Sequence, residues 1–136
     1  MTKAEILKKI QDLGYPENEV AIPLDDFFNS ENCVDAIGVN IYPDPPSCEK
    51  FYQVFKGLLS SEKADKIFVR ISDTEEPENW FFSDTIYVIG NLTLEELKSK
   101  IEKLQSDDIC KGWMYDEPVN IGEIQSGQNI YSIWWD

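Results

Sequence analysis

The order of its apolar periodicities is the feature that most limits what this chain can fold into. Apolar and small residues alternate from Val34 to Ile41, which predicts a strand. Helical stripes and β-rich runs then follow in turn. Their approximate ranges are 48–59 (helix), 66–71 and 82–89 (strands), 94–104 (helix) and 129–135 (strand). From residue 34 onward, the predicted order is therefore β-α-β-β-α-β.

That order has one well-known compact solution, the ferredoxin-like split βαβ sandwich, in which an antiparallel sheet carries both helices on one face. A further helix is predicted over residues 2–13, because Thr2 and Glu5 fit a capping box and Gly14 supplies a stop. We therefore expect a ferredoxin-like α+β fold with an extra N-terminal helix. A single domain over residues 1–136 is expected, since this length supports one core and is too short to argue for two.

Carboxylates dominate the charge of the chain. The net charge is −14, histidine is absent, and twenty of the 26 acidic residues lie in stretches without Lys or Arg. These stretches are 11–49, 71–97 and 112–136. Such a surface attracts cations and basic proteins, and it repels nucleic acid and anionic membrane. A hydrophobic content of 42% nevertheless predicts a folded domain.

The sequence predicts a cytoplasmic protein. No apolar run approaches the roughly 18 residues of a membrane span, and the charged start of the chain lacks the apolar segment of a signal peptide. Cys33, Cys48 and Cys110 are widely spaced and odd in number, so we expect neither a disulfide framework nor a CxxC motif. We interpret them as semi-buried hydrophobic residues in a reducing compartment.

No catalytic residue, metal site or cofactor is predicted. A nucleophilic cysteine would usually need a histidine to lower its pKa, and the chain has none. The acidic segment from Asp73 to Asp84 lacks the glycine and the final glutamate of a calcium loop. Zinc and copper sites normally recruit His or Cys, and the isolated glycines fit no phosphate loop or dinucleotide fingerprint. We therefore expect a protein that is not an enzyme.

The strongest candidate for a binding site is this same segment, Asp73 to Asp84. It joins two predicted strands and is longer than most hairpin loops. Its acids precede three aromatic residues, and Trp is over-represented among residues that dominate interface energies. The alternative is a solvated turn whose aromatic side chains fold back into the core. The candidate partner-binding residues are Glu75, Glu76, Glu78, Trp80 and Asp84, with a second patch of Asp25, Asp26 and Asp44.

Short aromatic motifs mark the last two-fifths of the chain. They are Phe82-Ser83-Asp84-Thr85-Ile86-Tyr87, Gly112-Trp113 and Ile130-Tyr131-Ser132-Ile133-Trp134-Trp135-Asp136. In these motifs the chain resembles small, acidic, largely uncharacterised bacterial proteins, among which are immunity proteins of toxin–immunity pairs. The resemblance implies a bacterial interaction protein and carries over no binding residue.

The leading hypothesis is a non-catalytic acidic domain, monomeric or homodimeric, that binds a basic protein such as a toxin nuclease. Neither nucleic acid nor membrane is an expected partner. A rival hypothesis is a small-ligand or effector-sensing α+β domain that uses the open sheet face or a helix–sheet crevice. A third is an enzyme with carboxylate-only chemistry, which clustered carboxylates of raised pKa in a deep pocket would favour.

Overall fold

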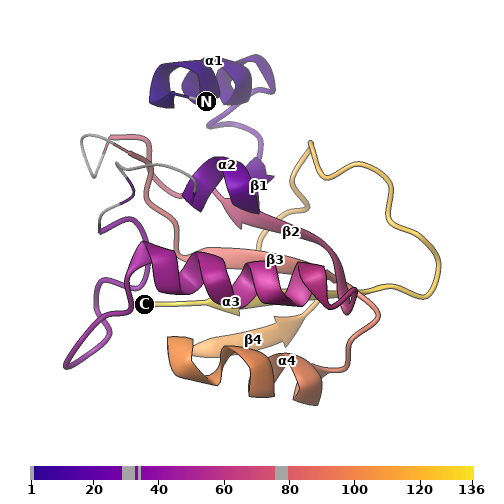
Figure 1. Cartoon of the computed structure of the whole chain (residues 1–136). Helices are drawn as coiled ribbons and strands as arrows, with labels where there is room; N and C mark the ends of the chain where they lie inside the picture. Colours follow the sequence, from indigo (N-terminus) through magenta and orange to yellow (C-terminus); the bar gives the residue numbers. More distant parts are fainter. Residues whose placement is uncertain (1, 29–32, 34, 76–79) are drawn as a thin grey trace.

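Five antiparallel strands form one sheet in the order β1-β2-β3-β5-β4 (Figure 1). The computed structural model describes residues 2–28, 33, 35–75 and 80–136. The strands are β1 (Ala21–Pro23), β2 (Ala64–Arg70), β3 (Thr85–Gly90), β4 (Asp108–Lys111) and β5 (Asn129–Trp134). The helices are α1 (Lys3–Asp12), α2 (Leu24–Phe28), α3 (Cys48–Ser60) and α4 (Leu94–Ile101), and a 3₁₀ turn, η1 (Glu102–Leu104), follows α4. The fold is α+β, as expected.

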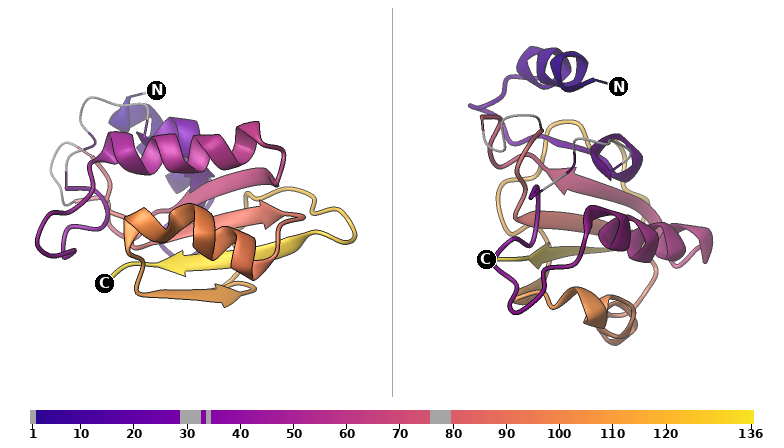
Figure 2. Two further views of the ribbon diagram at one scale, coloured as in Figure 1. Left: turned by 60° about the horizontal axis from the view of Figure 1, so that its bottom comes forward. Right: turned by 60° about the vertical axis from the view of Figure 1, so that its left-hand side comes forward.

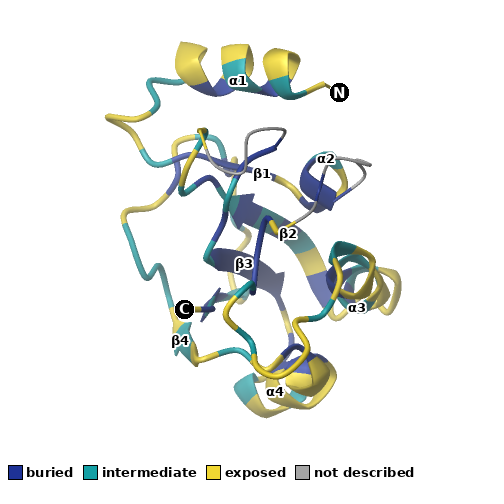
Figure 3. Ribbon diagram, turned by 90° about the vertical axis from the view of Figure 1, so that its left-hand side faces the viewer, coloured by how far each residue is buried: buried dark blue, intermediate teal, exposed yellow. Residues whose placement is uncertain are grey.

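Local sequence explains where the longer helices begin. Thr2 and Thr93 form the predicted capping boxes with Glu5 and Glu96, and the Ser47 hydroxyl accepts a hydrogen bond from the first turn of α3. The amphipathic α1 lies beyond the β1 edge of the sheet and turns its buried side inward (Figures 1 and 3). Within the described ranges, no helix combines the length and the apolar character needed to cross a bilayer.

The helices α3 and α4 cover one face of the sheet, as predicted (Figure 2). Their buried side chains join one large cluster with the strand residues that point toward them. The other face packs against the long segment 112–128, where Ile121 is buried against Tyr87 and Ile89 of β3. The sheet is therefore covered on both sides.

The predicted strand at 34–41 is not observed in residues 35–41, and Val34 lies outside the described residues. The segment makes turns instead, with Gly38 at a φ of +67°. A Cβ at Gly38 would lie 2.8 Å from Cζ of Phe51 in α3, so glycine is required where this loop meets the helix. The alternation of Ala36, Ile37 and Gly38 that suggested a strand reflects a loop packed on α3, and this prediction was wrong.

The ferredoxin-like strand order is therefore not confirmed. A short strand β1 that sequence analysis did not predict lies at the edge, antiparallel to β2, and β4 lies between the last predicted helix and the last predicted strand, where no strand was expected. One split crossover does occur. Because β3 and β4 are both antiparallel to β5, which lies between them, the unit β3-α4-β4 joins parallel strands that are not neighbours.

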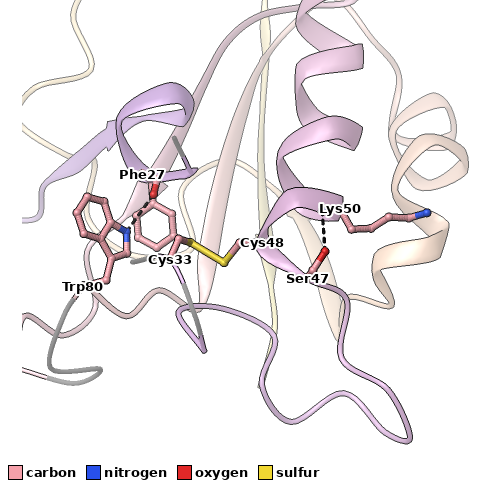
Figure 4. Close-up of a disulfide and its surroundings, with 6 residues drawn as sticks. All are labelled: Phe27, Cys33, Ser47, Cys48, Lys50 and Trp80. Carbon is pink, nitrogen blue, oxygen red and sulfur yellow. Dashed lines mark hydrogen bonds between the residues drawn. A yellow bond between two sulfur atoms is a disulfide. The ribbon is translucent and has the colours of Figure 1, made fainter. Parts of the chain in front are cut away.

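Cys33 and Cys48 form a disulfide, contrary to the sequence-based expectation (Figure 4). The intervening chain returns to the start of α3, which brings the two Cα atoms to 6.2 Å, within the range that a disulfide spans. Cys110 is a half-buried free thiol. Disulfides persist mainly in oxidising compartments. The expectation of unpaired cysteines supported a cytoplasmic location, and the disulfide removes that support. The cytoplasmic location stays a prediction.

Shortening the apolar side chains of α4 should destabilise the fold. Leu97 and Ile101 are 0% and 2% exposed. Because such changes leave a cavity in the core, Leu97→Ala or Ile101→Ala should lower the free energy of unfolding by about 2–5 kcal/mol in urea denaturation. Lys98→Ala, on the exposed side of the same helix, should change it by less than about 0.5 kcal/mol. Unchanged urea midpoints in both core variants would contradict the packing described here.

Opening the disulfide should also lower stability. The two cysteines are 15 residues apart, and closing a loop of this size stabilises a fold by about 3 kcal/mol in the chain-entropy model. Cys33→Ser should therefore lose about 3 kcal/mol in denaturant unfolding, whereas Cys110→Ser should retain the disulfide. Reductant should destabilise the wild type and leave Cys33→Ser unaffected. Equal midpoints for the oxidised and reduced wild type would refute the stabilising role.

Candidate partner-binding surface

Trp80, the predicted aromatic anchor, lies in the core. Its side chain is 1% exposed, its Nε1 donates a hydrogen bond of 2.9 Å to the Phe27 carbonyl oxygen, and its ring meets those of Phe27 and Phe81 edge to face (Figure 4). The bridge between Asp73 and Phe82 closes the base of the loop. The aromatic residues fold back inward, so in this conformation the Trp80 ring offers no surface to a partner.

Asp84 belongs to an internal polar network around Arg70. The Arg70 guanidinium contacts Asp84 at 3.3 Å and Glu19 at 2.6 Å, and it stacks 3.7 Å from the ring centroid of Tyr115. The hydroxyl of Thr85 also donates to the Asp84 carboxylate. Only 24% of the Asp84 side chain is exposed. Its charge is therefore largely compensated inside the fold, and its contacts point to a structural role.

Asp25 fastens α2 to α3. Its carboxylate accepts a 2.8 Å hydrogen bond from the Tyr52 hydroxyl and pairs with Lys56 at 3.1 Å. These contacts, the Tyr52 hydrogen bond above all, hold the pKa of Asp25 below its ordinary value, and the same contacts raise the pKa values of Tyr52 and Lys56. The negative charge of Asp25 is thus matched by a cation of the same chain.

The other predicted residues lie in separate parts of the fold. Asp26 is half-buried on α2, whereas Asp44 and Glu75 are exposed in the loops 35–47 and 71–84. Glu76 and Glu78 lie outside the described residues. The predicted set is therefore distributed over α2 and two loops. Of its described members, Asp44 and Glu75 are exposed, and their carboxylates take part in none of the ion pairs of the described residues.

An acidic cavity that sequence analysis missed lies beside the exposed Tyr42. The Tyr42 side chain is 88% exposed. The cavity has a volume of about 210 Å³. Its walls come from three separate stretches, and the lining residues are Asn40, Ile41, Tyr42, Gln105, Asp107 and Asp136. Two carboxylates and one phenol ring thus meet at one hollow.

Hydrogen bonds between distant segments hold this cavity in shape. The Asn40 side chain donates to the Asp136 carbonyl oxygen at 3.2 Å, and the Asp136 amide donates to the Asp107 carboxylate at 2.6 Å. The Asp107 amide donates in turn to the carbonyl oxygen of Trp134, the last residue of β5. The loop, the start of β4 and the chain after β5 are therefore joined. Within the described chain, no three His, Cys, Asp or Glu side chains are grouped to hold a metal ion.

The cavity suits a positively charged group. Carboxylates form charge-assisted hydrogen bonds with ammonium and guanidinium groups, and a tyrosine face attracts the same cations. Tyr42 directly follows the predicted strand 34–41, and Asp107 lies in a stretch without a predicted element, so neither residue was a candidate from the sequence. An exposed tyrosine in an acidic, proline-rich segment was the signal in the sequence that could have located it.

Comparison with known families accounts for nearly the whole chain. Residues 1–133 match the model described as the Uncharacterized protein YfbO family. The chain belongs to this family. The match agrees with the expected resemblance to uncharacterised bacterial-type proteins, and it does not show the resemblance to immunity proteins. No curated protein and no solved structure matches the chain significantly.

Removing the Tyr52 hydroxyl should raise the pKa of Asp25. In the folded protein this pKa lies below its ordinary value of 3.8, so Asp25 adds stability above the pKa of the unfolded chain and loses it as the pH falls through the folded value. In Tyr52→Phe, carboxyl-carbon NMR should show Asp25 titrating nearer its ordinary value. Tyr42→Phe, which keeps the Tyr52 contact, should leave the titration unchanged. An identical Asp25 titration in wild type and Tyr52→Phe would contradict this assignment.

Proposed function

We propose that the protein is a non-catalytic domain that binds a basic protein through an acidic surface centred on Tyr42. The cavity formed by Tyr42, Asp107 and Asp136 is the observation that supports this most directly. It combines an exposed aromatic ring with two carboxylates, and its hydrogen bonds hold it in place without the partner. A Lys or Arg side chain of the partner is the group that fits this arrangement.

Charge would guide the partner to this surface. The net charge of −14 produces a negative field, and Asp35 and Asp44 are exposed on the same loop as Tyr42. Such fields raise association rates for basic proteins, whereas buried aromatic contacts contribute more to the lifetime of a complex. Tyr42 takes the anchoring role that the sequence suggested for Trp80, because Trp80 is buried.

The predicted residues contribute to this proposal unequally. Asp44 and Glu75 remain candidate steering charges. Asp26, which is half-buried, also remains a candidate. Asp25 and Asp84 already pair with Lys56 and Arg70, so their first role is to hold the fold. Glu76 and Glu78 keep their proposed steering role, although they lie outside the described residues.

More specifically, we propose that the protein is an immunity or inhibitor protein. A toxin nuclease, or another protein that binds nucleic acid, carries the basic surface that an acidic inhibitor blocks. The resemblance of the aromatic motifs to small, acidic bacterial proteins, among which are immunity proteins, suggested this form. A monomer or homodimer in the cytoplasm belongs to the same proposal.

The rival hypothesis of effector sensing has less support. It named the open sheet face or a helix–sheet crevice as the site. The face opposite the helices is covered by segment 112–128, with Ile121 buried on Tyr87 and Ile89, which removes the first of these two places. The cavity beside Tyr42 is also small, with a volume of about 210 Å³. Cavities that enclose small-molecule ligands usually span about 300–1,000 Å³. The Tyr42 cavity is therefore small for such a ligand, and binding of a basic protein remains the stronger proposal for this surface.

Affinity capture followed by binding kinetics tests the proposal. The tagged wild type should enrich a basic protein from native cells at low salt, and the purified partner should associate more slowly as salt rises, because screening shortens the field to about 8 Å at physiological ionic strength. Tyr42→Ala should mainly speed dissociation, and Asp44→Lys should mainly slow association. If the partner is a nuclease, one equivalent of the protein should block its activity.

Matched variants separate this surface from the overall charge. Val119→Ala shortens another large exposed apolar side chain, which is 53% exposed, and it should leave dissociation unchanged. Glu117→Lys changes the net charge as much as Asp44→Lys and should slow association less. Capture of no basic protein would overturn the proposal. Equal effects of the test variants and their controls would remove the Tyr42 surface from it.

A further inference from the structure

A second hollow lies between α3 and α4, on the helical side of the molecule. It has a volume of about 390 Å³ and receives side chains from α3, α4 and η1. Lys50, Lys100 and Lys103 line it together with Val54, Gly57 and Leu58. We call it the α3–α4 groove. Its lining is mainly basic, although the chain as a whole is strongly acidic.

The groove concentrates positive charge in a strongly acidic protein. Three of the 12 Lys and Arg residues line it, against one carboxylate, that of Glu102. Nearby lysines behave differently, because Lys56 pairs with Asp25 and Lys63 with Glu96. Among the ion pairs of the described residues, none involves a lysine of the groove. In Figure 4 the Lys50 side chain extends away from the disulfide.

Gly57 keeps the middle of the groove open. It lies inside α3, where glycine lowers helix stability relative to alanine. A Cβ at this position would meet no atom of the described residues within 4 Å, so none of their contacts requires a glycine. Glycine in such a place allows another molecule to approach the helix backbone closely. This observation is independent of the lysines and indicates the same groove.

The length and walls of the groove favour a peptide over a single anion. Lys50 and Ser61 both line it, and they are separated along α3 by roughly 16 Å at the rise of an α-helix. About five residues of extended chain cover that distance. The half-buried Val54 adds an apolar wall beside the lysines, which suits a segment that combines apolar and acidic side chains.

We propose that the α3–α4 groove binds an acidic peptide segment of a protein partner. Carboxylates of the segment pair with Lys50, Lys100 and Lys103, and its apolar side chains pack on Val54 beside Gly57. This site is separate from the acidic surface at Tyr42 and has the opposite charge preference. It gives the domain a second binding surface that does not depend on the first.

Labelled peptides of defined composition test the proposal. Eight-residue peptides that combine Asp or Glu with Leu or Phe should move backbone NMR resonances of α3 and α4, and fluorescence anisotropy should show weaker binding as salt rises. Peptides with Lys in place of the acids should not bind in the groove. Replacing Lys50, Lys100 and Lys103 by Gln should weaken binding roughly tenfold.

Two control variants match these changes. Lys98→Gln removes a lysine from the exposed side of α4 outside the groove, and it should bind the acidic peptides like the wild type. Gly57→Leu should abolish binding by filling the groove, whereas Gly57→Ala should keep the fold and raise the melting temperature. Circular dichroism and thermal melts show whether Gly57→Leu remains folded. If it does not, the triple Gln variant carries the test.

Several results would overturn the proposal. One is that no acidic peptide of the set shifts the α3 and α4 resonances, and another is that Gly57→Leu binds with wild-type affinity while folded. Competition by inorganic phosphate at concentrations matched in charge would show a site for free anions. Concentration-dependent shifts of the same resonances without peptide, together with a larger mass by light scattering, would show that a second copy of the chain occupies the groove.

Discussion

The central strand β3 is the element on which the rest of the structure depends. All six of its residues are buried, and it pairs with β2 on one side and β5 on the other. Such a strand must be covered on both faces, since its side chains alternate between them. Ile86 and Val88 face the helices, whereas Tyr87 and Ile89 face segment 112–128. At its end, a Cβ on Gly90 would overlap the carbonyl oxygen of Lys63, so glycine lets the two backbones approach.

A polar network around Arg70 joins the sheet to the segment 112–128 that covers it. Arg70 of β2 joins Glu19, which precedes β1, to Asp84, which precedes β3, and stacks on Tyr115 of the covering segment. Four parts of the chain thus meet at one guanidinium group. The planar fork of arginine suits this role, because it can serve two carboxylates and an aromatic ring at once. Burial also raises the pKa of the neighbouring Tyr87 hydroxyl, which keeps it neutral on the covered face.

The two proposed binding surfaces follow from how the charges are distributed over this frame. Acids of the chain collect beside Tyr42, where the loop 35–47 meets Asp107 and Asp136. Lysines line the α3–α4 groove, where the helices pack on the sheet without filling the space between them. Neither surface is a continuous stretch of sequence. A net charge of −14 therefore describes the field at long range and hides the local preference of each surface.

The sequence by itself determined the elements whose signals are local. Hydroxyl caps and apolar spacing predicted the helices now seen as α1, α3 and α4, and β-rich runs predicted β2, β3 and β5. Only the tertiary structure decided what depends on distant contacts. Strands of three and four residues, β1 and β4, exist because a neighbour pairs with them. The loop 35–41 packs on Phe51, and Cys33 forms a disulfide with Cys48. The Trp80 side chain lies in the core, whereas that of Tyr42 is exposed. A residue pattern records which side chains favour burial, whereas the packing of the whole chain decides which of them find a place inside.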